Sequence, residues 1–273
     1  MIGQLENEIL SNIRTIPKGP ISLLLSGGID SSLVLALTRR EYPEVPIHTF
    51  TLARRIDYPD IVYSRQVAEL FGTIHHEKIV SNLELEEYSR EYDGVRRSSF
   101  RGDINVYILC SIARNYSKVI VTGDGGDECF GGYWLHKHPL GHKETGQIRC
   151  FEEIHPDSRK HLKEMVNLGF RDFLFKAKSS KEDYEAVWEY FVKILLPNHM
   201  EPLMNTGKIL DLDVYTPLFS QKLIFFLRTL QLPERIDRKI EKEIALRYLP
   251  KSIIERKSLG FDNALSFELH FKN

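Results

Sequence analysis

A short apolar run that ends in two glycines and a polar turn constrains the fold of this chain more than any other segment. Residues 21–32 read Ile-Ser-Leu-Leu-Leu-Ser-Gly-Gly-Ile-Asp-Ser-Ser. The first five residues are typical of a strand that is buried on both faces. The glycine pair permits a tight turn whose backbone N–H groups approach a ligand, and Asp30, Ser31 and Ser32 are typical of a helix start. The segment therefore predicts a strand, an anion site and a helix, in that order.

Strand and helix patterns alternate up to about residue 135 and then give way to helical patterns alone. Further strands are expected at 47–52, 75–80 and 118–122, and helices at 60–71, 83–92 and 104–114. Beyond residue 140, helices are expected at 157–168, 182–196, 221–230 and 238–249, with Pro197, Pro217, Pro233 and Pro250 separating them. The sequence predicts an α/β fold, a parallel sheet with helices on both faces in residues 1–135, plus a helical region in 136–273.

Composition restricts the compartment and the partners. The net charge is −1 and the isoelectric point is about 6.8, so no global field attracts nucleic acid or an acidic membrane surface. The three cysteines lack zinc-site spacing and cannot all pair, which favours a reducing compartment. Residues 1–16 have the spacing of an amphipathic helix, and no apolar run is long enough to cross a bilayer. We expect a cytoplasmic protein without a membrane partner, and a homo-oligomer remains open.

A second glycine-rich loop follows the predicted strand at 118–122. It reads Gly123-Asp124-Gly125-Gly126-Asp127-Glu128. Ligands of parallel α/β sheets bind at the carboxyl ends of the strands, so both glycine loops are expected at one edge. Mg²⁺ prefers oxygen ligands and often bridges carboxylates to phosphates, so Asp30 and Asp127 are predicted to hold Mg²⁺. For Asp30 alone, a role as the helix N-cap is the alternative.

The glycine loops together resemble those of a known enzyme family. Residues 26–32 have neither the lysine of a P-loop nor three glycines, and they resemble the pyrophosphate loop of the ATP pyrophosphatases. With residues 123–133 and Thr49-Phe50-Thr51-Leu52, they resemble the synthetase domain of asparagine synthetases. The resemblance implies an adenine nucleotide alpha hydrolase-like fold and the cofactors ATP and Mg²⁺. It implies that ATP is bound by Leu25, Ser26, Gly27, Gly28, Asp30, Ser31, Ser32, Thr51, Leu52 and Gly123.

The same resemblance implies three candidate catalytic residues. The family places an acid or a tyrosine at the position of Asp124, where it would take a proton from an attacking amine; a turn-stabilising aspartate is the alternative. Glu128 of the same loop is a second candidate. Near the C-terminus the family has Arg-Pro-Lys-x-Gly-Phe, whereas residues 256–261 read Arg-Lys-Ser-Leu-Gly-Phe. A serine stands at the lysine position, so Lys257 is predicted to substitute; Arg256, or a merely solvated Lys257, is the alternative.

The acceptor half of the sequence departs from the family. Residues 215–220 read Tyr-Thr-Pro-Leu-Phe-Ser where the family usually has Arg-Val-Pro-Phe-Leu-Asp. Arg238 and Lys242 match positions that are basic in the family, but a solvated helix face explains them equally well. About twenty residues precede the first loop, so we expect no glutaminase domain.

These features predict an ATP-dependent carbon–nitrogen ligase. It would adenylate a small-molecule carboxylic acid, release AMP and pyrophosphate, and take ammonia or an amine from outside the chain, for example from a separate glutaminase subunit. A tRNA-modifying enzyme of the pyrophosphatase fold and a non-catalytic nucleotide-binding regulator are the alternatives. The neutral charge argues against a nucleic-acid partner.

Overall fold

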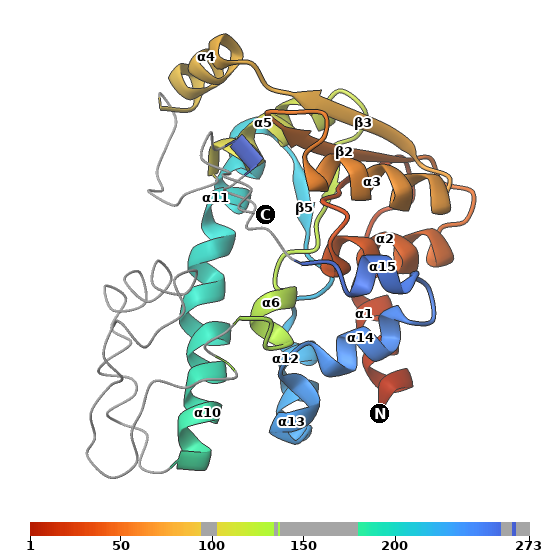
Figure 1. Ribbon diagram of the computed structural model, residues 1–273, viewed down its shortest axis with the longest axis vertical. Helices are drawn as coiled ribbons and strands as arrows, with labels where there is room; N and C mark the ends of the chain where they lie inside the picture. Colours follow the sequence, from red (N-terminus) through yellow and green to blue (C-terminus); the bar gives the residue numbers. More distant parts are fainter. Residues whose placement is uncertain (94–102, 134–135, 137–179, 258–263, 266–273) are drawn as a thin grey trace.

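One parallel sheet organises the computed structural model, which describes residues 1–93, 103–133, 136, 180–257 and 264–265. Its strands run in the order β3-β2-β1-β4-β5 (Figure 1). They are β1 (Ile21–Leu24), β2 (Ile47–Ala53), β3 (Ile74–Ile79), β4 (Val119–Val121) and β5 (Asp213–Tyr215). All four strand pairings are parallel. The central β1 has fully buried Ile21 and Leu23, as its continuous apolar run predicts.

Helices cover both faces of the sheet, which confirms the predicted fold class. Right-handed crossovers place α2 and α3 on one face, while α5 packs on β2 from the other. The helices are α1 (Ile2–Ile13), α2 (Ile29–Glu41), α3 (Pro59–Leu70), α4 (Asn82–Asp93), α5 (Asp103–Ala113), α6 (Gly126–Cys129), α10 (Ser180–Tyr190), α11 (Leu196–Leu210), α12 (Gln221–Thr229), α13 (Leu232–Arg235), α14 (Lys239–Ala245) and α15 (Lys251–Ile254). Within these ranges, no helix has the length and apolar character needed to cross a bilayer.

The amphipathic N-terminal segment forms α1 and joins the two halves of the chain. Leu5, Ile9 and Ile13 are fully buried, and their four-residue spacing puts them on one face. α1 packs against α2 of the first half and against α12 and α14 of the second. Through α1, the helices α12 and α14 therefore share a core with the helix α2 that covers the parallel sheet.

The edge strand β5 comes from the second half of the chain and was not anticipated. It pairs with β4, with Val119 opposite Asp213. The preceding helix ends at Asp211 in the left-handed conformation, at φ 56°. Gly207 lets the strand approach, because a Cβ there would lie 2.7 Å from Val214 Cγ2. The division of the chain near residue 135 stays a prediction.

The expectation that Pro197 ends a helix is wrong. α10 continues through a π-helical turn, η2 (Phe191–Leu195), directly into α11, which contains Pro197 and Pro202. Proline removes a backbone donor and clashes with the preceding turn of a regular α-helix. The wider π-helical turn ahead of Pro197 relieves that clash, so the helix proceeds. The helix expected at 157–168 lies outside the described residues.

Candidate functional site at the carboxyl edge of the sheet

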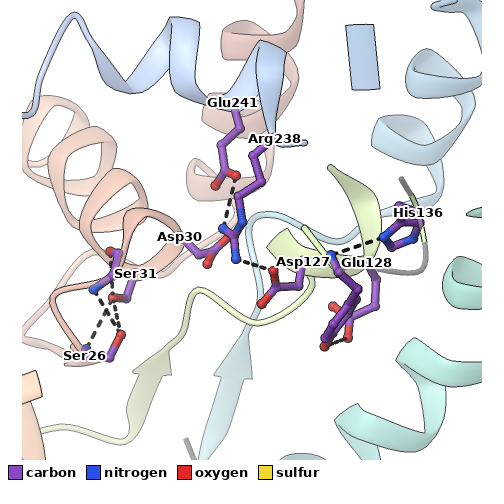
Figure 2. A network of polar contacts seen from close by, with 10 residues as sticks. Ser26, Asp30, Ser31, Asp127, Glu128, His136, Arg238 and Glu241 are labelled. Atoms are coloured by element: carbon purple, nitrogen blue, oxygen red, sulfur yellow. Dashed lines mark hydrogen bonds and ion pairs between the residues drawn. The ribbon is translucent and has the colours of Figure 1, made fainter. Parts of the chain in front are cut away.

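The first glycine loop, residues 26–28, is a tight turn that cannot carry a side chain at its centre. Gly27 has φ 70°, and a Cβ there would lie 2.5 Å from the Tyr63 carbonyl carbon of α3. The loop is tied to α2 through Ser31, whose Oγ accepts from Ser26 N at 3.3 Å and lies 3.1 Å from Ser26 Oγ (Figure 2). Gly28 is the N-cap of α2 and provides no side-chain cap, so the backbone N–H groups of this helix end keep an anion-binding character.

The second glycine loop lies directly over the start of α2. A Cβ at Gly123 would lie 2.5 Å from Ser31 N, and a Cβ at Gly126 would lie 2.5 Å from Asp30 Cγ. Gly125 adopts φ 96° and caps α6. Two glycines without side chains thus let the loops touch, and this contact brings Asp30 and Asp127 into one cluster.

One guanidinium joins these two carboxylates (Figure 2). Arg238 donates from Nη1 to Asp30 Oδ1 at 2.5 Å and from Nη2 to Asp127 Oδ1. Burial alone would lower the pKa of Arg238, but Asp127, Asp30 and Glu241 raise it well above its ordinary value. Burial also raises the pKa of Asp127 to about 6 against the effect of Arg238. The N-cap alternative for Asp30 is wrong, because Gly28 is the cap and Asp30 faces Arg238.

A strained backbone aims Arg238 at the cluster. Asp237 and Arg238 have φ 57° and 56°, a conformation that non-glycine residues rarely adopt. Their N–H groups donate to the carbonyl oxygens of Gly131 at 3.0 Å and Phe130 at 2.8 Å. Arg238 is 8% exposed, so the solvated-face explanation is wrong for this residue. The second glycine loop therefore fixes both the carboxylate and the cation.

A third carboxyl group, Glu241, was missed from the sequence. It is fully buried, and its Oε2 accepts from Arg238 Nη1 at 3.3 Å. Burial raises the pKa of Glu241 well above its ordinary value, and Asp30 raises it further, while Arg238 opposes both. One signal was available, since Glu241 falls within the apolar stripe that contains Ile240 and Ile244.

Asp124 and Glu128, the two candidate catalytic acids, have different environments. Asp124 is exposed, yet the surrounding protein removes part of its hydration and so raises its pKa; Glu128 and Asp30 add to the increase. Glu128 is buried, and its Oε1 accepts from Tyr133 Oη and from His199 Nδ1, both at 2.8 Å. Burial would raise the pKa of Glu128, but these donors outweigh it and leave the pKa lowered. Whether either acid takes part in catalysis stays a prediction.

Comparison with known proteins assigns a family. A family model described as asparagine synthase matches residues 11–270. The chain belongs to the asparagine synthase family. This membership confirms the resemblance that the two glycine loops carry.

The chain spans less than half the length of the curated relatives it matches. A putative asparagine synthetase [glutamine-hydrolyzing] 2 of Methanocaldococcus jannaschii is 34% identical over 120 residues, covering 43% of this chain and 23% of the relative. A second protein of that organism, putative asparagine synthetase [glutamine-hydrolyzing] 1, is 26% identical over 266 residues, covering 92% and 46%. Among solved structures, an NH3-dependent NAD synthetase from Campylobacter jejuni is 17% identical with a TM-score of 0.34, covering 84% of this chain and 90% of its own.

Of the two basic residues near the C-terminus, Arg256 and Lys257, Arg256 lies at the first glycine loop. Arg256 donates from Nη1 to Ser26 O at 2.7 Å and from Nη2 to Asp60 Oδ1, and its guanidinium lies 4.8 Å from the centre of the Tyr63 ring. Lys257 is exposed. The part predicted for Lys257 stays a prediction, and the neighbouring serine of the family's lysine position lies outside the described residues.

The remaining predicted nucleotide residues lie at the same edge. β2 pairs with β1 up to Phe50 and with β3 up to Ala53, so Thr51 and Leu52 lie beyond the end of β1. Leu25 N donates to Phe50 O at 2.8 Å, which ties the first loop to this strand end. The Ser32 hydroxyl is buried without a hydrogen-bond partner in the described part of the chain. Nucleotide contacts of these residues stay predictions.

In residues 215–220, neutral residues of this chain replace two charged residues of the family pattern, and one of them, Ser220, has a structural role. Ser220 is the N-cap of α12, where its Oγ accepts from Leu223 N at 3.2 Å and from Asn12 Nδ2 at 3.1 Å. A hydroxyl that caps a helix and binds α1 has little freedom to bind a charged ligand. The change from the family's aspartate therefore removes a charge from this part of the molecule.

The carboxylate pair fits a magnesium ion only together with outside ligands. Across the described ranges, no group of three or more His, Cys, Asp or Glu residues is arranged to hold a metal. The ligand atoms of Asp30 and Asp127 are carboxylate oxygens, and both carboxylates already bind the Arg238 guanidinium. Mg²⁺ typically takes one or two carboxylates and completes its shell with phosphate oxygens and water, so this pair fits that use.

The cysteines near the site are expected to be inert. Cys110 and Cys129 are buried free thiols; burial raises the pKa of Cys110 to about 12 and that of Cys129 well above its ordinary value. Because the thiolate is the nucleophile, iodoacetamide should modify neither residue in the folded protein at about pH 8 and both after denaturation. Mass mapping of the two peptides measures this. Fast labelling of native Cys129 would show that it is not a packing residue.

Proposed function

We propose that this chain carries the ATP-using, adenylate-forming part of an amide-forming ligase. One observation carries the proposal: the two glycine loops meet at the carboxyl edge of the sheet and bring Asp30 and Asp127 onto one cation beside an open helix N-terminus. A polyphosphate is bound by backbone N–H groups and a cationic side chain, and carboxylates assist by holding a metal ion against it. Membership of the asparagine synthase family supports a ligase that uses ATP, and it leaves the identity of the acid substrate unspecified.

In the proposed site, the phosphates lie against the start of α2. The backbone of Gly27 and Gly28 and the hydroxyl of Ser26 would bind phosphate oxygens, and Arg238 would add a buried positive charge. Thr51 and Leu52 would contact adenine at the end of β2. Asp30 and Asp127 would hold Mg²⁺, which when bound neutralises phosphate charge.

Two chemical steps would follow on this scaffold. An oxygen of the substrate carboxylate attacks the α-phosphorus of ATP, the bond to the β-phosphate oxygen breaks, and pyrophosphate leaves. The nitrogen of ammonia or an amine then attacks the acyl carbon, and AMP leaves with the electrons of the C–O bond. Asp124 would take the proton that the nitrogen loses, and its raised pKa makes the carboxylate a stronger base for that step.

The partners follow from the same proposal. The substrate is a small carboxylic acid, and the nitrogen arrives as ammonia or as an amine, which a separate glutaminase subunit could deliver. The neutral substitutions at residues 215–220 favour an acid other than aspartate. The three cysteines, which lack zinc-site spacing and cannot all pair with one another, favour a reducing compartment such as the cytoplasm.

A screen for acid-dependent formation of AMP and pyrophosphate tests this function. Purified protein with ATP, Mg²⁺ and ammonia should release both products with at least one acid. Asp127→Asn should reduce the rate about a hundredfold or more, because it removes charge where the phosphates bind. Asp57→Asn, which breaks an exposed pair with Arg55, is the matched control and should keep full activity. Full turnover by Asp127→Asn would overturn the assignment, and ATP binding without turnover on any acid would favour a regulator.

A further inference from the structure

A buried hydrogen-bonded pair connects the second glycine loop with the long helix of the acceptor half. His199 Nδ1 lies 2.8 Å from Glu128 Oε1, and the Tyr133 hydroxyl donates to the same oxygen at 2.8 Å. The side chains of His199 and Glu128 are 13% and 5% exposed. A carboxylate in such a place requires donors, and these two side-chain donors bind the same oxygen.

The local helix geometry places His199 for this contact. The π-helical turn η2 and Pro197 immediately precede it on the chain. A π-helical turn inserts an extra residue and so rotates all following side chains about the helix axis; such turns are frequent at functional sites. η2 packs against α6, the short helix that carries Asp127 and Glu128. The irregular turn and the histidine therefore face the second glycine loop together.

Glu128 of this pair and Asp124 belong to the same glycine loop. Loss of hydration raises the pKa of Asp124, Glu128 and Asp30 raise it further, and the Thr122 contact and His199 lower it. Asp124 N also donates to Thr122 Oγ1 at 3.3 Å, which fixes the backbone of the loop. Removal of the imidazole would leave the buried Glu128 carboxylate with the Tyr133 hydroxyl but without its contact to α11.

We propose that His199 is a positioning residue for the amide-forming step, acting through Glu128 on Asp124. The inference rests on the proposed function and adds a residue to its acceptor half. The imidazole holds the Glu128 carboxylate on the α11 side of α6, away from the carboxylate pair that Arg238 joins. It thereby fixes the second glycine loop, which also carries Asp124, for the step in which the nitrogen loses its proton.

Two half-reactions separate this role from general support of the fold. His199→Leu should slow amine-dependent amide formation about tenfold or more near pH 7, since the loop that carries Glu128 and Asp124 would lose a buried contact to α11. Acid-dependent exchange of pyrophosphate into ATP should stay within about twofold of the wild type, because that step uses the other carboxylates. His199→Asn keeps a donor near the Nδ1 position and should recover part of the rate.

Met204→Ala, an exposed change on the same helix, is the matched control and should alter neither half-reaction. Equal slowing of both half-reactions, or no change in either, would overturn the proposal; if His199→Leu does not fold, His199→Asn decides between these outcomes. A measurement independent of turnover is the exchange of the His199 Nδ1 proton with solvent, followed by NMR. It should be slow in the wild type and fast in Glu128→Gln. If no acid supports pyrophosphate exchange, the proposed function fails, while this measurement still tests the pair.

Discussion

Replacement of Arg238 by methionine is expected to lower the free energy of unfolding by about 3–5 kcal/mol near pH 8. Methionine keeps much of the apolar stem but leaves Asp30, Asp127 and Glu241 without the cation that they share. Removing one partner of a buried ionic cluster costs far more than the net value of the cluster, because the remaining charges stay desolvated. Urea unfolding followed by circular dichroism measures the loss.

The loss should shrink at lower pH. The folded-state pKa of Asp127 is about 6, above the ordinary value near 3.8 that the unfolded chain has. The folded state therefore binds more protons than the unfolded state between these values, and stability falls as the pH rises through that window. Arg238 lowers the pKa of Asp127, so its removal moves the upper end of the window higher. The difference between wild type and Arg238→Met should be larger at about pH 8 than at about pH 5.5.

Arg228→Met is the matched control for this prediction. Arg228 pairs with Glu189 through two hydrogen bonds of 2.6 and 2.9 Å, but the Arg228 side chain is 37% exposed. Its loss should cost about 1 kcal/mol or less. Added Mg²⁺ should raise the urea midpoint of Arg238→Met more than that of the wild type, since the freed carboxylates gain a ligand that the unfolded chain lacks. Equal losses in the two variants would show that Arg238 does not neutralise a buried cluster.

Local patterns were sufficient to predict the backbone turns of the two glycine loops. A strand followed by Ser26, Gly27 and Gly28 permits few conformations, and Gly27 and Gly125 indeed adopt positive φ. The meeting of Asp30 with Asp127 required one further step, the rule that parallel strands present their carboxyl ends at one edge. Short-range residue chemistry and the topology of the sheet together determine this part of the site.

The position of the cation depends on long-range packing, which no local pattern contains. Arg238 reaches Asp30 across 208 positions of the chain, and its aim depends on two left-handed residues held by the second loop. As a sequence feature it was a basic residue on a helix, and that description fits a solvated face equally well. The apolar stripe of α14 indicates that Glu241 is buried, but its partner Arg238 follows only from the assembled cluster.

Two other features escaped prediction because they break regular periodicity. β5 has three residues, too few to show strand alternation, and it is defined by its pairing with β4. Pro197 ordinarily indicates a helix end, but the π-helical turn before it carries the helix onward. Through that turn the face of α11 is shifted, so the contact of His199 with Glu128 could not be read from a 3.6-residue period.

Among single methyl additions, Gly126→Ala is expected to reduce the proposed activity most. A Cβ there would lie 2.5 Å from Asp30 Cγ and would overlap the carboxylate oxygen that Arg238 binds. Gly126→Ala should therefore displace the Asp30 carboxylate by about an ångström and reduce acid-dependent AMP formation about a hundredfold. Overpacking should also cost about 1–3 kcal/mol of unfolding free energy. Urea unfolding and the AMP assay on the same preparation measure both effects.

Gly3→Ala is the control, because it adds the same methyl group inside α1 with nothing within 4 Å. Alanine is the better helix former, so this variant should be unchanged or more stable by up to about 1 kcal/mol and fully active. Gly132→Ala should resemble Gly126→Ala, since its Cβ would lie 2.6 Å from Arg238 Nε and 3.0 Å from Asp127 Cγ. A Gly126→Ala protein that folds and keeps full AMP formation would mean that the chemistry does not depend on the position of the Asp30 carboxylate.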